Sequence, residues 1–494
     1  MQIMPNERTI EGDLFSAFVS AGAISKANAN DPKKSTLVRC ARTDKGVHAA
    51  GNVVSLKLIV EDEDIVEKIN THLPPQIRVW GFLRTIGSFS CYAACDSRWY
   101  EYLIPTHCFL PPNPASFLGK KIVELAKEAD DVEGYQSRQG AEKDFWKFAE
   151  EKHVAPILAR LDDNLRSLIN KALYEEENVG EFEAFEAIQK KEAKMEEEAL
   201  NKAGTSGQEQ SAPDQPTNDE ATEPRKPSTI KIAGTSIKTV DLSGEQQASL
   251  DQAIKDIKEA HYHAKAEYRI TPERLERVKL AFSQYKGTSN YHNYTVRKMA
   301  TDPSAKRHMK SFEVNGDPMI LSGTEWISLK VHGQSFMMHQ IRKMVSMAAL
   351  IVRCGTPVVR IPESFEHTTI AIPKAPGLGL LLERPIFDTY NKIQAEKFDK
   401  EPIDFSKYDA QIQEFKQREI YNRIFEEDAK DHTFYNFFSH VDGYKESSFL
   451  YLSSKGFDAV KAARVAPGRK SVEKALVEAS DSEEERMARG GEEG

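Results

Sequence analysis

The stretch that most constrains the fold is a long acidic segment near the middle of the chain, residues 185–228, rich in Glu, Ala, Gln, Ser, Thr and Pro. A segment of this composition cannot bury enough apolar surface to offset its conformational entropy, which predicts disorder. Strand-like sequence resumes only near residue 229. The folded part of the chain is therefore divided into two halves by an insertion or a linker.

Each half mixes helical and strand-like patterns. In the first half, "TIEGDLFSAFVSAGAI" has the apolar spacing of an amphipathic helix with Thr9 as its cap, and four strands are expected in "STLVRCAR", "GNVVSLKLIV", "IRVWGFLRTI" and "SRWYEYLIPT". In the second half, "WISLKVHGQSF" alternates like a half-buried strand, and "MMHQIRKMVSMAALIVRCG" predicts a helix ended by Gly355 and Pro357. The patterns predict an α+β fold with a sheet face open for binding.

Composition and pattern together place the domain boundaries. We expect an N-terminal α+β subdomain (1–110), a helical insertion (111–184), a disordered acidic linker (185–228), a helical connector (229–265), a second α+β subdomain (266–390), a helical C-terminal extension (391–450) and a disordered acidic tail (451–494).

The net charge of −9 conceals a basic folded part. Residues 175–224 carry −11 and residues 471–494 carry −5, so the remaining 420 residues carry +7. Residues 281–353 hold 10 Lys or Arg against 4 acidic residues, interleaved with aromatic side chains. Basic and aromatic residues together are typical of surfaces that hold phosphates and stack unpaired bases, which favours a nucleic-acid partner.

Other features exclude some classes of protein. The chain has no apolar run long enough to span a membrane, and its first residues lack the apolar core of a secretory signal. Five scattered cysteines favour a reducing compartment. Cys91, Cys95, His107 and Cys108 resemble a metal cluster only loosely, and free buried thiols are the simpler interpretation. The sequence contains no phosphate-binding glycine loop, which predicts chemistry without an organic cofactor.

Asp44 is the first candidate for a reactive residue, within "ARTDKGVHAA". Its neighbours Arg42 and Lys45 are cationic, and nearby positive charge lowers the pKa of a carboxyl group, which keeps it ionised. On these residues alone, however, a simple turn that uses Asp and Gly for its backbone angles is the favoured interpretation.

The other candidates are also ambiguous from sequence. On the helix that starts in "SFMMHQIRKMV", His339, Arg342 and Lys343 are polar exceptions among apolar residues, and Arg342 either reaches solvent or meets a buried carboxylate. On the strand in "SRWYEYLIPT", alternation places Tyr100 and Tyr102 on one face and Trp99 on the other. Each aromatic side chain fits core packing as well as base stacking.

Five blocks in order resemble the TruA-type pseudouridine synthases: "ARTDKGVHAAGNVVSLKL", "ACDSRWYEYLIPT", "KGTSNYHNYT", "SFMMHQIRKMV" and "PKAPGLGLLLERPIFDTY". The residues of the first two blocks are most similar to the eukaryotic branch, the nuclear multisite tRNA enzymes of fungi and animals. The resemblance covers residues 1–110 and 266–390.

The resemblance implies an isomerase that converts uridine to pseudouridine in tRNA. By similarity, Asp44 is the essential aspartate and Arg342 its cationic partner, Tyr100 stacks on the target uracil, Arg42 helps to displace the flipped base, and Phe336 lines the substrate side. Whether Asp44 attacks the sugar or first deprotonates it stays open. The family's catalytic domain consists of two ferredoxin-like subdomains with joined antiparallel sheets and a central basic cleft.

The resemblance also sets expectations about partners. It implies a monomer that acts on tRNA, with small nuclear RNA or messenger RNA as further substrates, in the nucleus and also in mitochondria. No metal ligands are predicted from the residues, although zinc is associated with some fungal relatives. Members normally begin with a β-strand that this chain, starting at "MQIMPNERTIEGDL", does not include. If that strand is lost, we expect reduced stability and an RNA-binding or tRNA-folding protein with impaired catalysis.

Overall fold

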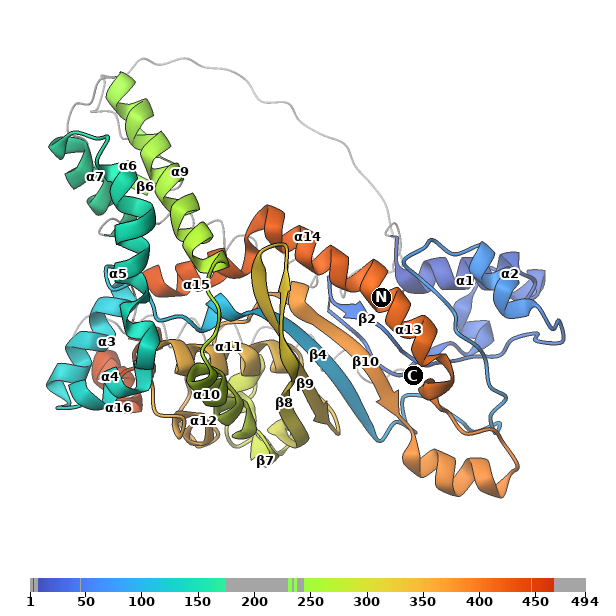
Figure 1. Cartoon of the computed structure of the whole chain (residues 1–494). Helices are drawn as coiled ribbons and strands as arrows, with labels where there is room; N and C mark the ends of the chain where they lie inside the picture. The colour runs from blue at the N-terminus through green and yellow to red at the C-terminus, as the bar shows by residue number, and fades with distance from the viewer. Residues whose placement is uncertain are drawn as a thin grey trace, which may run out of the picture.

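The computed structural model describes residue 3 and residues 8–44, 46–174, 230–232, 235–237, 244–445 and 447–465. At its centre is a six-stranded sheet with strand order β2-β10-β4-β9-β8-β7, surrounded by helices (Figure 1). The strands are β2 (His48–Ala49), β4 (Ser97–Pro105), β7 (Gly287–Asn290), β8 (Lys306–Leu321), β9 (Thr324–Gly333) and β10 (Leu380–Ile386). The mixture of helix and sheet confirms the predicted α+β class. The predicted linker, 185–228, lies outside the described residues.

One sheet joins the two halves of the chain. Strand β4, from the first half, lies between β9 and β10 from the second half and is antiparallel to each; Tyr100 is opposite Val331 on one side and Leu382 on the other. The short β2 pairs with β10 in parallel at the edge of the sheet. Because β2 follows the Asp44 loop within four residues, this pairing brings the loop against a strand that is more than 330 residues away in sequence.

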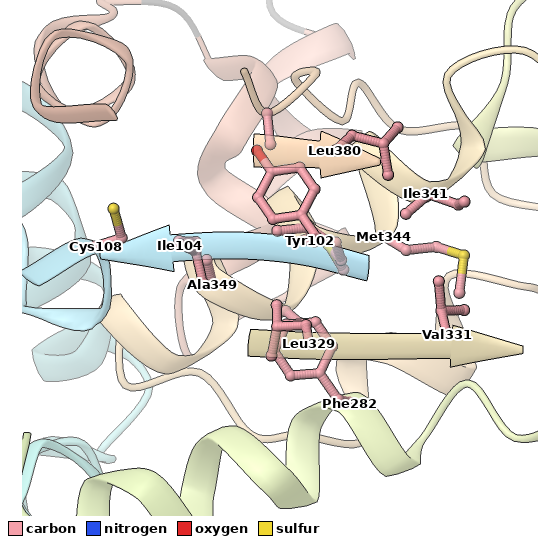
Figure 2. Packing of buried hydrophobic residues seen from close by; sticks show 14 of the residues in the cluster. Tyr102, Ile104, Cys108, Phe282, Leu329, Val331, Ile341, Met344, Ala349 and Leu380 are labelled. Carbon is pink, nitrogen blue, oxygen red and sulfur yellow. The ribbon is translucent and has the colours of Figure 1, made fainter. Parts of the chain in front are cut away.

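Alternation along β4 determines which side chains enter the core. Tyr100 and Tyr102 belong to the main buried cluster, which includes Phe282 of α10 (Pro272–Ser283) and Met344 of α11 (Gln340–Arg353). Figure 2 shows Tyr102, Phe282 and Met344 packed around strands β4, β9 and β10. Trp99 lies outside this cluster and stacks on His332, with ring centroids 4.3 Å apart. The predicted division of the aromatic residues between two faces is therefore correct.

Helix α11 forms where its apolar periodicity predicts a helix, and nearly all of its residues are buried. Its C-terminus is followed by Gly355 in the left-handed region with φ of 58°, a conformation that glycine adopts without a steric penalty. Thr271 caps α10 by accepting a hydrogen bond from the backbone N–H of Arg274 at 3.2 Å. The ends of the two core helices are therefore specified by local sequence.

The C-terminal helices α13 (Asp409–Phe415), α14 (Asn422–Asp431) and α15 (Thr433–Gly443) also pack on the main buried cluster. Figure 1 shows α13 and α14 beside β10. Between α13 and α14, Lys416 is buried and contacts two buried carboxylates of the sheet, Glu101 at 2.9 Å and Glu383. Nζ of Lys330 also lies 3.2 Å from Oε2 of Glu101. A cluster of paired charges therefore anchors the C-terminal helices to the sheet.

The predicted start of a disordered tail at residue 451 is wrong. Tyr451 and Leu452 are fully buried, and α16 (Phe457–Val465) follows them. Tyr451 donates its hydroxyl to the carbonyl of Ala371, and Thr356 donates to the carbonyl of Leu452. The acidic composition that suggested a tail belongs to residues 466–494, which lie outside the described residues.

The middle of the chain contributes helices of its own. They are α3 (Phe117–Glu128), α4 (Val132–Gln139), α5 (Phe145–Ala149), α6 (Ala155–Leu158), α7 (Asp163–Tyr174) and α9 (Gly244–Ala266), with a short hairpin of β5 (Ile230–Ile232) and β6 (Thr235–Ile237) before α9. Leu165 and Ile169 of α7 pack with Leu250 and Ile254 of α9 in a small separate core. In Figure 1, α6, α7 and α9 stand away from the sheet at the upper left.

Near the start of the chain, the predicted helix forms but the predicted strands are much shorter than expected. Helix α1 (Ile10–Ser20) forms as predicted, with Thr9 accepting from Gly12 at 3.1 Å, and packs on α2 (Ile65–Thr71). Two strands were expected, one on either side of the Asp44 loop. Within them, the described pairing is limited to the short strands β1 (Val38–Arg39) and β3 (Val54–Ser55), which are antiparallel.

Residues 77–86, predicted as a strand, are not one. The side chain of Asn70 accepts from the N–H of Val79 and donates to its C=O, and so takes the place of a neighbouring strand. None of the helices that the structure describes is long and apolar enough to cross a membrane.

Candidate active site

Asp44 lies in the loop between β1 and β2. Its carbonyl accepts from Val47 at 3.1 Å across a turn in which Gly46 has φ of 79°, so the local sequence does form a turn. The loop is tied at its ends: the Asn52 side chain donates to the carbonyl of Ala41 at 3.0 Å, and Ala50 donates to Leu382 of β10 at 2.8 Å. The turn and the reactive carboxylate are thus compatible interpretations of one loop.

The carboxylate of Asp44 meets the start of α11. Nδ1 of His339 lies 3.0 Å from Oδ2 of Asp44, and Nη1 of Arg342 lies 4.0 Å from the same oxygen. Arg342 is held in place because its Nε–H donates to the carbonyl of Ala375 at 2.6 Å. The predicted approach of Arg342 to Asp44 is present in the structure, but His339 is the nearer partner.

The surroundings favour the ionised form of Asp44. Burial alone would raise the pKa of Asp44, but the hydrogen bond from His339 and the positive charges of His339, Arg342 and Lys374 outweigh it, so the pKa lies below its ordinary value of 3.8. The side chain is 29% exposed, which leaves it accessible to a ligand. The result is a carboxylate that is charged at neutral pH and can act as a nucleophile or a base.

An aromatic pair lies close to this carboxylate. Tyr100 of β4 is 7% exposed and meets Phe336 edge to face, with ring centroids 5.2 Å apart. Burial raises the pKa of Tyr100 and the charge of Asp44 raises it further, so the phenol stays neutral. Gly333 makes room for this arrangement, because a Cβ there would lie 2.7 Å from the ring of Phe336.

Arg42 precedes Asp44 by two residues and is exposed. Within the part of the chain that the structure describes, no hydrogen bond or ion pair engages its side chain, so it is free to meet a ligand. The structure therefore brings Asp44 to Arg342 and Tyr100 to Phe336, and leaves Arg42 at the open side. Lys45 lies outside the described residues.

Sequence reasoning did not assign a role to three residues of this site: His339, Lys374 and Arg98. Arg98 joins the two halves, since one nitrogen donates to the carbonyl of Cys40 at 3.0 Å and another to Gln334 at 3.3 Å. His339 stood out as a polar exception, and its place three residues before Arg342, near one helical turn, could have suggested a shared role. Arg98 and Lys374 lie in the quoted motif blocks, but their roles depend on contacts across the fold.

The cysteines do not form the loose cluster considered from sequence. Cys91 and Cys95 lie with Cys40 in one small apolar cluster, whereas Cys108 belongs to the main core, beside His107. Among the described residues there is no group of three or more His, Cys, Asp or Glu side chains placed to hold a metal ion.

The chain is similar to known proteins. The family model described as tRNA pseudouridine synthase matches residues 281–388, which include α11 and β10. The chain is 42% identical to tRNA pseudouridine synthase 1 of Yarrowia lipolytica over 458 residues, covering 92% of this chain and 74% of the relative. For the Schizosaccharomyces pombe protein of the same name, identity is 41%, with coverage of 92% and 83%.

A more distant relative is aligned along nearly its whole length. The tRNA pseudouridine(27/28) synthase of Saccharomyces cerevisiae is 31% identical over 440 residues, which cover 88% of this chain and 94% of the relative. With such identities extending over most of each protein, the chain belongs to the TruA-type tRNA pseudouridine synthases, a family of isomerases.

Proposed function

We propose that this protein isomerises uridine to pseudouridine in tRNA, with Asp44 as the catalytic residue. The observation that carries the proposal is the meeting of an ionised Asp44 with His339 and Arg342 beside the aromatic pair of Tyr100 and Phe336. The names of the relatives support the choice of tRNA as substrate.

The reaction needs a base outside its stack. Flipping a nucleotide costs about a few kcal/mol, which an aromatic platform and a cation near the vacated space can offset. Tyr100 supplies the platform, packed in place by Phe336, and the exposed Arg42 supplies the cation. A neutral phenol suits this role, because a buried phenolate would repel Asp44.

The isomerisation is redox-neutral and requires no organic cofactor. The bond between ribose C1′ and uracil N1 breaks, the base rotates, and a bond from C1′ to C5 forms; C5 loses a proton and N1 gains one. Asp44 either attacks C1′ or removes a proton from the sugar as the base departs. For each route the carboxylate must be ionised, which its cationic neighbours favour.

Finer features belong to the same proposal. We include two ferredoxin-like subdomains around a basic cleft, supported by the insertion of β4 between β9 and β10. The proposal also includes a monomer located in the nucleus and in mitochondria, with small nuclear RNA and messenger RNA as further substrates.

The direct test is to incubate the protein with unmodified tRNA and to map pseudouridine chemically. We expect modification by the unaltered protein and none by Asp44→Asn, while Glu61→Gln, which changes an exposed carboxylate, stays active. Equal modification by Asp44→Asn, or tRNA binding without any pseudouridine, would contradict the proposal and favour an RNA-binding protein without catalysis.

A further inference from the structure

We propose that His339 is a positioning residue that binds one oxygen of Asp44, Oδ2, and thereby presents the other oxygen, Oδ1, to the reacting nucleotide. This inference rests on the proposed function and assigns a task within the same site. It divides the carboxylate into an anchored oxygen and a reactive one.

The contacts of Asp44 are one-sided. The interactions with His339 at 3.0 Å and with Arg342 at 4.0 Å are made by Oδ2. Among the described residues, Oδ1 has no hydrogen-bond partner. A carboxylate held through one oxygen cannot rotate freely about its terminal torsion, so its second oxygen keeps a constant direction.

The backbone of His339 is held in an uncommon conformation. Its φ of 60° and ψ of 3° lie in the left-handed region, which few residues other than glycine adopt and in which asparagine, aspartate and histidine are the most common exceptions. The neighbouring residues are tied on each side: Met337 donates its N–H to the side chain of Gln340 at 2.9 Å, and the hydroxyl of Thr295 donates to the carbonyl of Met338 at 3.1 Å. The surrounding contacts therefore maintain the left-handed turn that directs the imidazole at Asp44.

Two simpler roles for His339 do not account for the contact. The residue is the N-cap of α11, yet its side chain makes no capping hydrogen bond. A histidine that only filled the core would direct its ring nitrogen to a neutral backbone group, whereas Nδ1 of His339 meets a charged carboxylate while the side chain is 7% exposed. The ring therefore binds Asp44 and does not cap the helix.

Two substitutions separate the hydrogen bond from the backbone conformation. His339→Asn tolerates the left-handed backbone and places an amide N–H close to the position of Nδ1, whereas His339→Gly tolerates the backbone even better and removes the donor. Lost hydrogen bonds to charged groups change equilibria by roughly ten- to hundredfold, so the two variants predict distinct rates. His263→Ala, at an exposed histidine of α9, is the matched control.

The experiment measures single-turnover pseudouridine formation at saturating tRNA, together with the Kd for tRNA, across a range of pH. We expect His339→Gly to lose roughly ten- to hundredfold in rate with an unchanged Kd, and His339→Asn to retain most of the rate. The acidic limb of the rate profile should move to higher pH in His339→Gly, because loss of the His339 hydrogen bond raises the pKa of Asp44. Arg342 and Lys374 remain as cations facing Asp44, and the neutral Tyr100 does not replace the donor.

The outcomes distinguish this inference from the function on which it rests. If the unaltered protein forms no pseudouridine, the proposed function and the inference fail together. If the unaltered protein is active and His339→Gly matches it in rate and pH profile, the function stands and the assignment of His339 is wrong. A His339→Asn variant as slow as His339→Gly would also overturn the assignment, since a retained donor should rescue the rate.

Discussion

Nη1 of Arg342 lies 4.0 Å from Oδ2 of Asp44, although the two residues come from different halves of the chain. The contact depends on two anchors, the hydrogen bond of Arg342 to Ala375 and the pairing of β2 with β10. The pKa of Asp44 therefore depends on contacts that form only when the sheet is assembled.

Substitution of Arg342 should change the pH dependence of the reaction. In the native site the low pKa of Asp44 keeps it ionised at mildly acidic pH; Arg342→Gln removes a positive charge, raises that pKa and moves the acidic limb of the rate profile to higher pH, by about one pH unit. Arg342→Lys keeps the charge and should move the limb less. Single-turnover rates measured against pH test this, and an unmoved limb in Arg342→Gln would contradict it.

The exposed segment after Thr295 should contact tRNA beside the active site. Thr295 is hydrogen-bonded to the carbonyl of Met338, next to His339, and the segment then exposes Lys298, Met299 at 72% and Lys306. Replacing Lys298 and Lys306 with Gln should weaken tRNA binding without changing the rate at saturation.

The salt dependence of binding provides the check for this segment. Each lost phosphate contact should reduce the slope of log affinity against log salt by about 0.7–0.9. Lys461→Gln, on α16, is the control and should leave the slope unchanged. An unchanged slope in the Lys298 and Lys306 variant would place the tRNA elsewhere.

Lys416→Met should destabilise the protein. The change leaves Lys330 as the cation that contacts the buried Glu101 and Glu383, and loss of one partner of a buried ion pair costs about 3–5 kcal/mol. Urea denaturation measures the effect. Lys407→Met, at an exposed pair with Glu401, should leave the free energy of unfolding almost unchanged. Similar values for the two variants would refute a role for the buried charges.

Asp428→Asn should stabilise the protein at neutral pH. Burial raises the pKa of Asp428 from 3.8 to about 6, although its Oδ1 accepts from the N–H of Phe434 at 3.0 Å. Because the folded pKa exceeds the unfolded one, the carboxylate costs nothing below pH 3.8, costs more as pH rises to 6, and costs up to about 3 kcal/mol above that. Asparagine keeps the acceptor without the charge.

Thermal unfolding at pH 4 and at pH 7.5 tests this prediction, with a gain in Tm expected only at the higher pH. Asp404→Asn is the control, because hydrogen bonds from Ser406 lower the pKa of Asp404 and its charge is therefore favourable. A gain of equal size at the two pH values for Asp428→Asn would show that its charge is not the cause.

Several elements followed from local sequence, for local reasons. The apolar spacing of α11 and its terminal Gly355 specify a helix whatever it packs against, and Thr9 marks the start of α1 in the same way. The order of the motif blocks linked Asp44 to Arg342, although the neighbours of each residue left its role open.

Strand predictions succeeded or failed according to their partners. The segment 97–106 forms β4 because β9 and β10 flank it, while 77–86 has the same kind of pattern and forms no strand, because Asn70 occupies the hydrogen-bonding groups of Val79. A strand is stabilised by its neighbours, so its own pattern decides less than the pattern of a helix does.

The sequence by itself determined helices α1 and α11, the faces of β4 and the basic character of the folded part, and its motif blocks linked Asp44 with Arg342. Only the tertiary structure decided that His339 is the nearest partner of Asp44, and that Arg98 joins Cys40 to Gln334. The physical reason is distance along the chain: His339 and Asp44 are 295 residues apart, and a contact over that separation exists only after the sheet has joined the two halves.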